Sequence, residues 1–204
     1  MLESQSVRPR PLPPPSLHLR AVEHLRFIRD TMEGAAVFTA VPGLGEVVVG
    51  FTAVVAAFLA SRQPSAERWL AIWAIEGFVG FLATAIAVVW KAKRADISLF
   101  SSPGRRFALG LFPPLIAGGI LTASLFAAGN YTLLPGLWLL LYGAGVVGGG
   151  SSSVRIVPVM GAAFMALGAA TLLLPSSWGD GMMALGFGGL LVLFGCVIAW
   201  RHGG

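Results

Sequence analysis

The sequence predicts an all-α integral membrane protein: a bundle of six transmembrane helices built from three helical hairpins, preceded by an N-terminal amphipathic helix. Three observations predict this class. The chain is 56% hydrophobic and 11% charged with a mean hydropathy of +0.80, which leaves too little polar surface for a soluble domain of 204 residues. Apolar segments of membrane-spanning length follow one another along it. The basic residues gather between alternate segments.

The N-terminal region carries two different patterns. Residues 1–15 are polar and contain five prolines, which predicts a disordered tail. Residues 16–34 predict an amphipathic helix that lies in the membrane interface, because apolar residues fall on one stripe at helical spacing. That stripe consists of Leu17, Ala21, Leu25, Ile28 and Met32. A cytosolic cap packed on the bundle fits the same stripe.

Residues 35–204 form the predicted transmembrane domain. A helix rises about 1.5 Å per residue, so about 20 apolar residues cross the hydrocarbon. The predicted spans are 37–60, 69–90, 107–128, 133–149, 156–174 and 182–200. The glycines and serines at 148–153 predict a turn between the short fourth and fifth spans. Pro113 and Pro114 interrupt the hydrogen-bond ladder of the third span, which either kinks the helix or opens a cavity.

The basic residues predict the orientation. With six spans, twelve of the fourteen Lys and Arg side chains fall on one side, and Arg62 and Arg68 fall on the other. The positive-inside rule then places both termini and the 91–106 connection in the cytoplasm. We expect the membrane to be a bacterial inner membrane, with the lipid bilayer as the first partner.

Glycines 27 residues apart recur in the three pairs of spans. The pairs are Gly50 with Gly77, Gly118 with Gly145, and Gly161 with Gly188. Pro-Ser turns at 64–65 and 175–176 support the same repeat. The pattern predicts three similar hairpins and assigns these six glycines to helix packing. An inverted three-plus-three repeat is the alternative, because 42–44 and 135–137 share the sequence Pro-Gly-Leu.

The last third of the chain has a characteristic glycine spacing. Gly161, Gly168 and Pro175 follow seven-residue steps, and Gly186, Gly188 and Gly195 run through the next span. This pattern over 156–200 resembles the repeated hairpins of the HdeD-like small membrane proteins, which are associated with bacterial acid resistance. The resemblance implies a stress-related role without catalytic residues. The long N-terminal extension and the charged 91–106 connection depart from that family's compact pattern.

Glu46 and Glu76 are the candidate site residues, because each lies inside an apolar span. Hydrocarbon disfavours an ionised carboxyl, and the spans contain no Lys or Arg that could pair with it. One hypothesis is a proton or cation relay through both side chains. The other is a neutral carboxyl hydrogen-bonded to a neighbouring helix.

The remaining motifs argue against catalytic and cofactor-binding classes. The glycines at 143–148 match a dinucleotide fingerprint, but no strand precedes them. The three histidines lie outside the spans, and Cys196 is alone, so we expect no metal, no cofactor and no enzyme activity. No basic stripe predicts nucleic acid. The expected function is a helical bundle that acts by association, with itself or with another membrane protein. The alternative is a small transporter or channel that uses Glu46 and Glu76.

Overall fold

The computed structural model describes residues 24–25, 41–94, 101–151 and 153–202. The chain divides into two units, Met1–Ala35 and Ala36–Gly204. The predicted tail at 1–15 lies outside the described residues. So does the predicted amphipathic helix at 16–34, apart from His24 and Leu25, which are helical. Every helix of the bundle belongs to the second unit.

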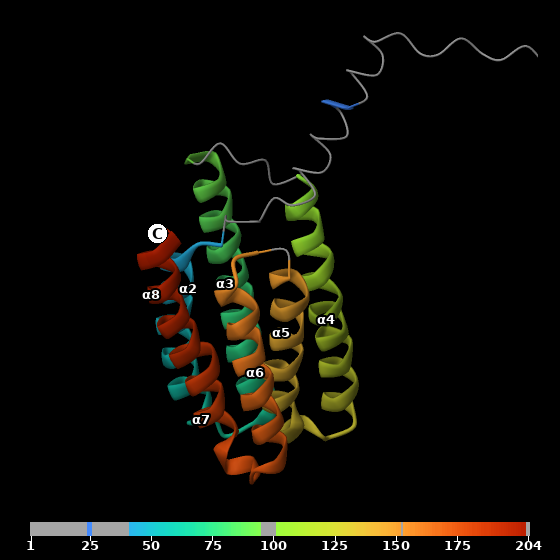
Figure 1. Ribbon diagram of the computed structural model, residues 1–204. Coiled ribbons are helices and arrows are strands. Elements are labelled where there is room, and N and C mark those ends of the chain that lie inside the picture. The colour runs from blue at the N-terminus through green and yellow to red at the C-terminus, as the bar shows by residue number, and fades with distance from the viewer. Residues whose placement is uncertain (1–23, 26–40, 95–100, 152, 203–204) are drawn as a thin grey trace, which may run out of the picture. The chain divides into compact units, whose positions relative to one another are not determined.

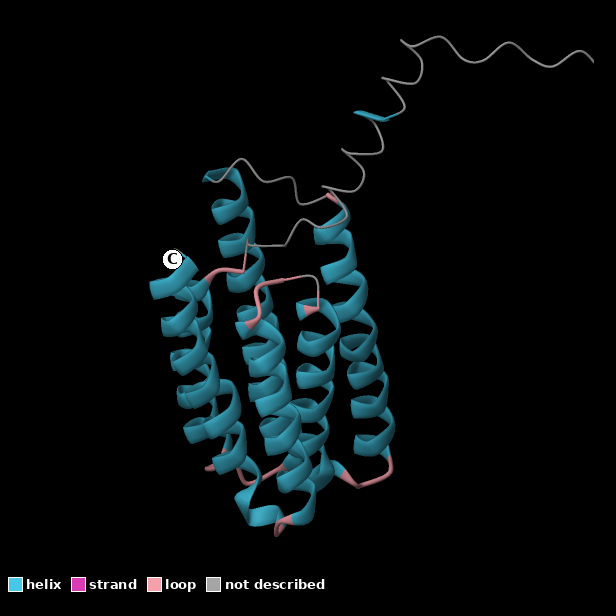
Figure 2. Ribbon diagram, in the orientation of Figure 1, coloured by secondary structure: helices cyan, strands magenta, loops and turns pink. Residues whose placement is uncertain are grey.

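The described part of the second unit consists of helices joined by short connections, without a strand (Figure 2). Its helices are α2 (Gly43–Ala60), α3 (Ala66–Arg94), α4 (Ser102–Ala127), α5 (Leu134–Gly150), α6 (Ile156–Leu173), α7 (Gly179–Met183) and α8 (Leu191–His202), with η1 (Tyr131–Leu133), η2 (Ser176–Trp178) and η3 (Ala184–Leu190) between them. Within the described residues, six helical segments are long and apolar enough to cross a membrane, since η1 extends α5 and η2, α7, η3 and α8 run on as one segment. The predicted all-α class and six membrane-length helices are confirmed.

Helix α4 shows how local sequence sets the helix ends. Ser101 adopts an extended conformation before the helix, and Pro103 lies in the first turn, where its missing N–H costs nothing. At the other end Gly129 has a φ of 77°. The Asn130 N–H donates to the Leu125 carbonyl at 2.8 Å, and the Gly129 N–H donates to the Phe126 carbonyl at 3.0 Å. This is the Schellman arrangement, for which glycine is the favoured residue.

The predicted turn at 148–153 is wrong in its first half, because α5 continues through all three glycines. A Cβ on Gly149 would lie 2.7 Å from the Phe107 carbonyl oxygen of α4, and a Cβ on Gly150 would lie 2.9 Å from Val157. The glycines therefore allow α5 to approach its neighbours closely, and packing overrides their low helix propensity. The turn begins at Ser151.

Glycines at seven-residue spacing join α5 to α6, which lie side by side (Figure 1). A Cβ on Gly168 would lie 2.9 Å from the carbonyl oxygen of Gly136, and one on Gly136 would lie 3.1 Å from that of Gly168. Gly143 and Gly161 repeat the pairing about two turns further along. Since a side chain at these positions would collide with backbone, glycine sets the distance between the helices.

The same device joins the first and last spans. A Cβ on Gly50 would lie 2.9 Å from the carbonyl oxygen of Gly188, and one on Gly195 would lie 2.8 Å from that of Gly43. Helix α2 consequently packs along α8 and η3, although they are far apart in the chain (Figure 1). Helix α6 packs mainly on α5 and touches α8 little. The packing therefore does not confirm three equivalent hairpins.

The six glycines predicted to pack helices occupy different surroundings. Gly50, Gly161 and Gly188 lie in the close contacts just described, and a Cβ on Gly145 would lie 2.9 Å from the Leu111 carbonyl oxygen. At Gly118 the nearest atom is a methyl group of Leu141 at 3.4 Å, an ordinary contact. Gly77 differs, because no heavy atom lies within 4 Å of its Cβ position. It faces open space.

The last span is not a uniform α-helix. Residues Ala184–Leu190 form a π-helical segment between α7 and α8. A π turn closes its hydrogen bonds over one additional residue and widens the helix locally. Gly186 and Gly188 in this segment are buried, and Phe187 points to the interior cavity described below.

Candidate functional site

A cavity of about 490 Å³, partly open to the outside, lies among the spans of the second unit, and we call it the central cavity. Each span contributes to its wall. Examples are Glu46 of α2, Gly77 of α3, Pro114 of α4, Tyr142 of α5, Met160 of α6 and Phe187 of η3. Most of the wall is aliphatic or aromatic. Its volume falls in the range of about 300–1,000 Å³ that is typical of pockets for small organic molecules.

Glycines and a proline widen the cavity between α3 and α4. Gly77 of α3 and Gly119 of α4 line it, and no heavy atom lies within 4 Å of either Cβ position. Pro114 also lines it, whereas Pro113 is exposed and does not. Helix α3 packs along α2 and α4 along α5, with no comparable packing of α3 on α4. Phe81 and Phe112 meet edge to face across this seam, with ring centroids 6.4 Å apart.

Glu46 is the buried acid of the central cavity. It lies in the first turn of α2 and is only 6% exposed. Its Cβ lies 3.0 Å from the Cβ position of Gly195, so α8 covers its base. No described residue forms a hydrogen bond with its carboxyl. Every fully enclosed side-chain oxygen among the described residues has a hydrogen-bond partner, so the Glu46 oxygens cannot be fully enclosed. The carboxyl therefore faces the cavity space, where a ligand or water can reach it.

Glu76 lines the same cavity but is held by a neighbouring helix. Thr52 Oγ1 lies 2.8 Å from Glu76 Oε1 and 2.9 Å from the carbonyl oxygen of Val49. A hydroxyl has one hydrogen. Both contacts are hydrogen bonds at once when Glu76 is protonated and donates to Thr52, while Thr52 donates to Val49. The Glu76 carboxyl is thus hydrogen-bonded to a neighbouring helix, and its neutral state stays a prediction.

The two glutamates thus share a cavity without sharing a role. Glu46 is free to meet a ligand, whereas the Glu76 carboxyl joins α3 to α2. Tyr142 is the other titratable residue on the described wall. Among the described residues, the cavity lining includes no Lys, Arg or His. The wall therefore carries acids and no compensating base.

Aromatic side chains form much of the cavity surface around these acids. Tyr142 packs against Phe164 and Phe187 with ring centroids 4.8 and 5.2 Å apart. Trp73, Phe81 and Phe107 contribute from α3 and α4. Aromatic faces carry negative potential and attract cations. The site therefore combines a large apolar surface with two features that favour positive charge.

A tryptophan cluster joins α3, α4, α5 and α7, and Trp73, Trp138 and Thr122 of this cluster line the cavity. Trp69 stacks on Trp138 with centroids 5.5 Å apart and an interplanar angle of 10°. Trp69 Nε1 donates to Asp180 Oδ1 at 2.7 Å, and Trp73 Nε1 lies 3.5 Å from the same oxygen. Trp138 Nε1 donates to Thr122 Oγ1 at 2.7 Å. The hydrogen bonds join α3 to α7 and α5 to α4, and the stacked rings join α3 to α5.

Sequence reasoning missed Asp180, Thr122 and Tyr142. Asp180 precedes the last apolar run, and nothing in its neighbourhood indicates that it meets Trp69, 111 residues earlier. Tyr142 had a usable signal, because it is the only one of the two tyrosines inside a predicted span. A tyrosine there needs a partner or a polar space for its hydroxyl.

Over the described ranges no three His, Cys, Asp or Glu side chains group as metal ligands would. Comparison with known protein families, with curated proteins and with solved structures finds no match to this chain. The resemblance of 156–200 to the HdeD-like proteins therefore stays a prediction. The central cavity is therefore the feature from which a function can be inferred.

Proposed function

We propose that this protein is a small transporter of the bacterial inner membrane, in which Glu46 exchanges a proton for a solute in the central cavity. The observation that carries this proposal is the carboxyl of Glu46, 6% exposed and without a hydrogen-bond partner among the described residues, on the wall of a cavity of about 490 Å³. An isolated charge is costly there, so the neutral carboxyl is the resting form and a positively charged or hydrogen-bonding solute favours release of the proton.

The cavity supports transport over simple association. A bundle that works by packing gains nothing from an unpaired acid beside an interior space, because each costs stability. The glycines that suggested association, Gly50, Gly161 and Gly188, face other helices of the same chain. These glycines therefore pack helices of the same chain together and give no evidence for contact with a second molecule. Association with a copy or with another membrane protein remains a prediction.

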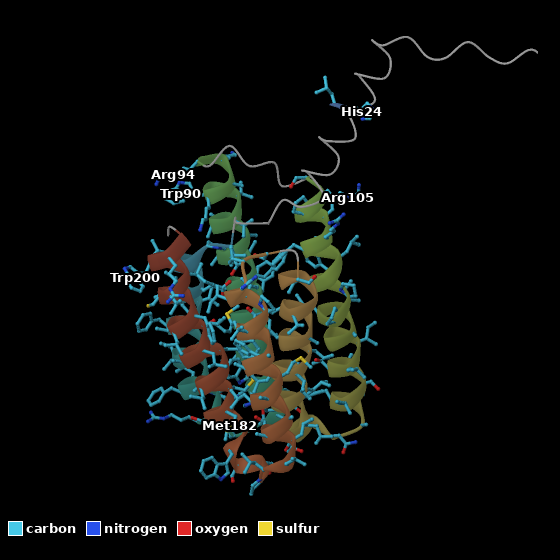
Figure 3. The ribbon with its side chains drawn as sticks, viewed as in Figure 1. His24, Trp90, Arg94, Arg105, Met182 and Trp200 are labelled. Atoms are coloured by element: carbon cyan, nitrogen blue, oxygen red, sulfur yellow. The ribbon has the colours of Figure 1, made fainter. Side chains whose placement is uncertain are left out.

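The orientation is the second part of the proposal. Lys91, Lys93 and Arg94 end α3, and Arg105 and Arg106 begin α4 at the same end of the bundle. Figure 3 shows Arg94 and Arg105 at the end where Trp200 lies, with Met182 toward the opposite end. We infer that this end is cytoplasmic, so the tryptophan cluster faces the periplasm. Glu46 then lies nearer the cytoplasm.

The test is proton movement that depends on a solute. Purified protein is reconstituted in liposomes with a pH-sensitive dye inside, and organic cations, anions and neutral solutes are added in turn. We expect at least one charge class to produce a proton flux above that of protein-free liposomes, and Glu46→Gln to abolish it. Glu67→Gln is the matched control, because Glu67 is exposed at the start of α3 and does not line the cavity. Wild-type flux at background for every class would reject the transporter.

A further inference from the structure

The ligand class follows from the wall of the central cavity. We propose that the cavity binds a singly charged organic cation with a large apolar body, such as a lipophilic amine or a quaternary onium ion. The inference deepens the transporter proposal, since it names the solute, but it concerns binding alone. The proposal rests on a buried acid, Glu46, that has no basic residue beside it and lies in a cavity lined with aromatic rings.

Charge is the first step. The cavity holds two carboxyls, and Lys, Arg and His are absent from its described lining. Thr52 holds the Glu76 carboxyl at 2.8 Å, which leaves Glu46 as the acid available to a ligand. A bound cation beside Glu46 would form an ion pair away from water, whereas an anion would meet only acids and the negative faces of the rings.

Apolar character is the second step. Trp73, Phe107, Tyr142 and Phe187 supply rings, and Val49, Leu111 and Met160 supply aliphatic surface. A small hydrated cation would lose its water here without gaining enough oxygen ligands, because hard metal ions require six or more. A bulky organic cation brings its own apolar surface and is weakly hydrated. Its burial in the cavity offsets the cost of removing the charge from water.

Size is the third step. The cavity of about 490 Å³ has room for a molecule with several rings. Gly77 and Gly119 provide part of this room, because neither has a heavy atom within 4 Å of its Cβ position. A leucine at residue 119 would extend into the space and leave Glu46 untouched. The contribution of volume can therefore be separated from that of charge.

The experiment is equilibrium dialysis of the purified full-length protein in neutral detergent, with tetraphenylphosphonium as the probe. Tetraphenylborate is the control, since it has nearly the same shape and the opposite charge. We expect saturable binding of the cation at least tenfold tighter than that of the anion. Glu46→Gln should weaken cation binding at least tenfold, and Glu46→Asp, which keeps the carboxylate, should weaken it less. Gly119→Leu should weaken it through lost volume.

Three results would overturn the inference: no saturable binding of tetraphenylphosphonium, equal or tighter binding of tetraphenylborate, or unchanged cation binding in Glu46→Gln. Each variant must give the same gel-filtration profile as the wild type, and Glu46→Asp is the second variant if Glu46→Gln does not fold. The two proposals fail separately. Cation binding without proton flux would reject transport and keep the binding site, whereas flux driven only by neutral or anionic solutes would reject the cation and keep transport.

Discussion

Gly143 of α5 and Gly161 of α6 face each other so closely that neither has room for a methyl group. A Cβ on Gly143 would lie 2.6 Å from the Gly161 carbonyl oxygen, and a Cβ on Gly161 would lie 2.7 Å from that of Gly143. Contact between two backbones on this scale maximises van der Waals packing, which is the main force that holds helices together in a bilayer. The contact therefore sets the separation of the two helices.

The first prediction concerns this contact. Gly161→Ala should destabilise the protein by about 1–3 kcal/mol, because the added methyl group forces α5 and α6 apart. Gly77→Ala is the matched control in a second span, since no atom lies within 4 Å of its Cβ position. It should be neutral or stabilising by about 0.5–1 kcal/mol through the higher helix propensity of alanine. Thermal unfolding in detergent measures both. Equal melting temperatures for the two variants would show that glycine spacing does not hold the helices.

The second prediction concerns the tryptophan cluster. Thr122 and Thr171 each donate to the carbonyl four residues earlier at 2.7 Å, but only Thr122 also accepts from Trp138 Nε1. Thr122→Val should therefore cost about 0.6–1.7 kcal/mol, the scale of a side-chain hydrogen bond between membrane helices. Thr171→Val should cost less, because it removes no contact between helices. Unfolding in a detergent titration compares them, and an equal loss in both variants would assign no stabilising role to the Trp138 bond.

The third prediction tests the orientation with two matched serines. Ser61 Oγ donates to the Phe58 carbonyl at 3.0 Å, and Ser151 Oγ donates to the Gly148 carbonyl at 2.7 Å. Both are exposed, and they lie in connections at opposite ends of the bundle. In a Cys196→Ala background, a membrane-impermeant maleimide should label Ser61→Cys in intact cells with a permeabilised outer membrane. It should label Ser151→Cys only after lysis. The reverse pattern would invert the topology and place Glu46 nearer the periplasm.

The sequence allowed the six spans to be predicted because hydrocarbon thickness fixes their length and composition. It was harder to predict which spans pack against one another. The seven-residue spacing of Gly161 and Gly168 indicates a packing face, but it does not say that α5 lies against it. Gly77 looks like Gly50 in the sequence, yet it borders empty space. Whether a glycine serves contact or volume depends on the opposite helix, and local sequence carries no information about that helix.

The candidate site, too, could be predicted only in part, because it depends on which helices pack together. Glu46 and Glu76 stood out because acids are rare in apolar spans, and both line the central cavity. Their different surroundings depend on Thr52, which lies 24 residues from Glu76 and reaches it only when α2 packs on α3. The volume of the cavity depends on several helices together. No single segment could have predicted it.

The π-helical segment of the last span separates two stretches of helix that pack differently. Gly181, Gly188 and Gly195 are evenly spaced in the sequence, but only Gly188 and Gly195 meet α2, and nothing lies within 4 Å of the Cβ position of Gly181. The extra residue in a π turn shifts the register of what precedes it. Met183 is thereby aimed at the interior. One continuous span therefore presents differently packed glycines on the two sides of its π-helical segment.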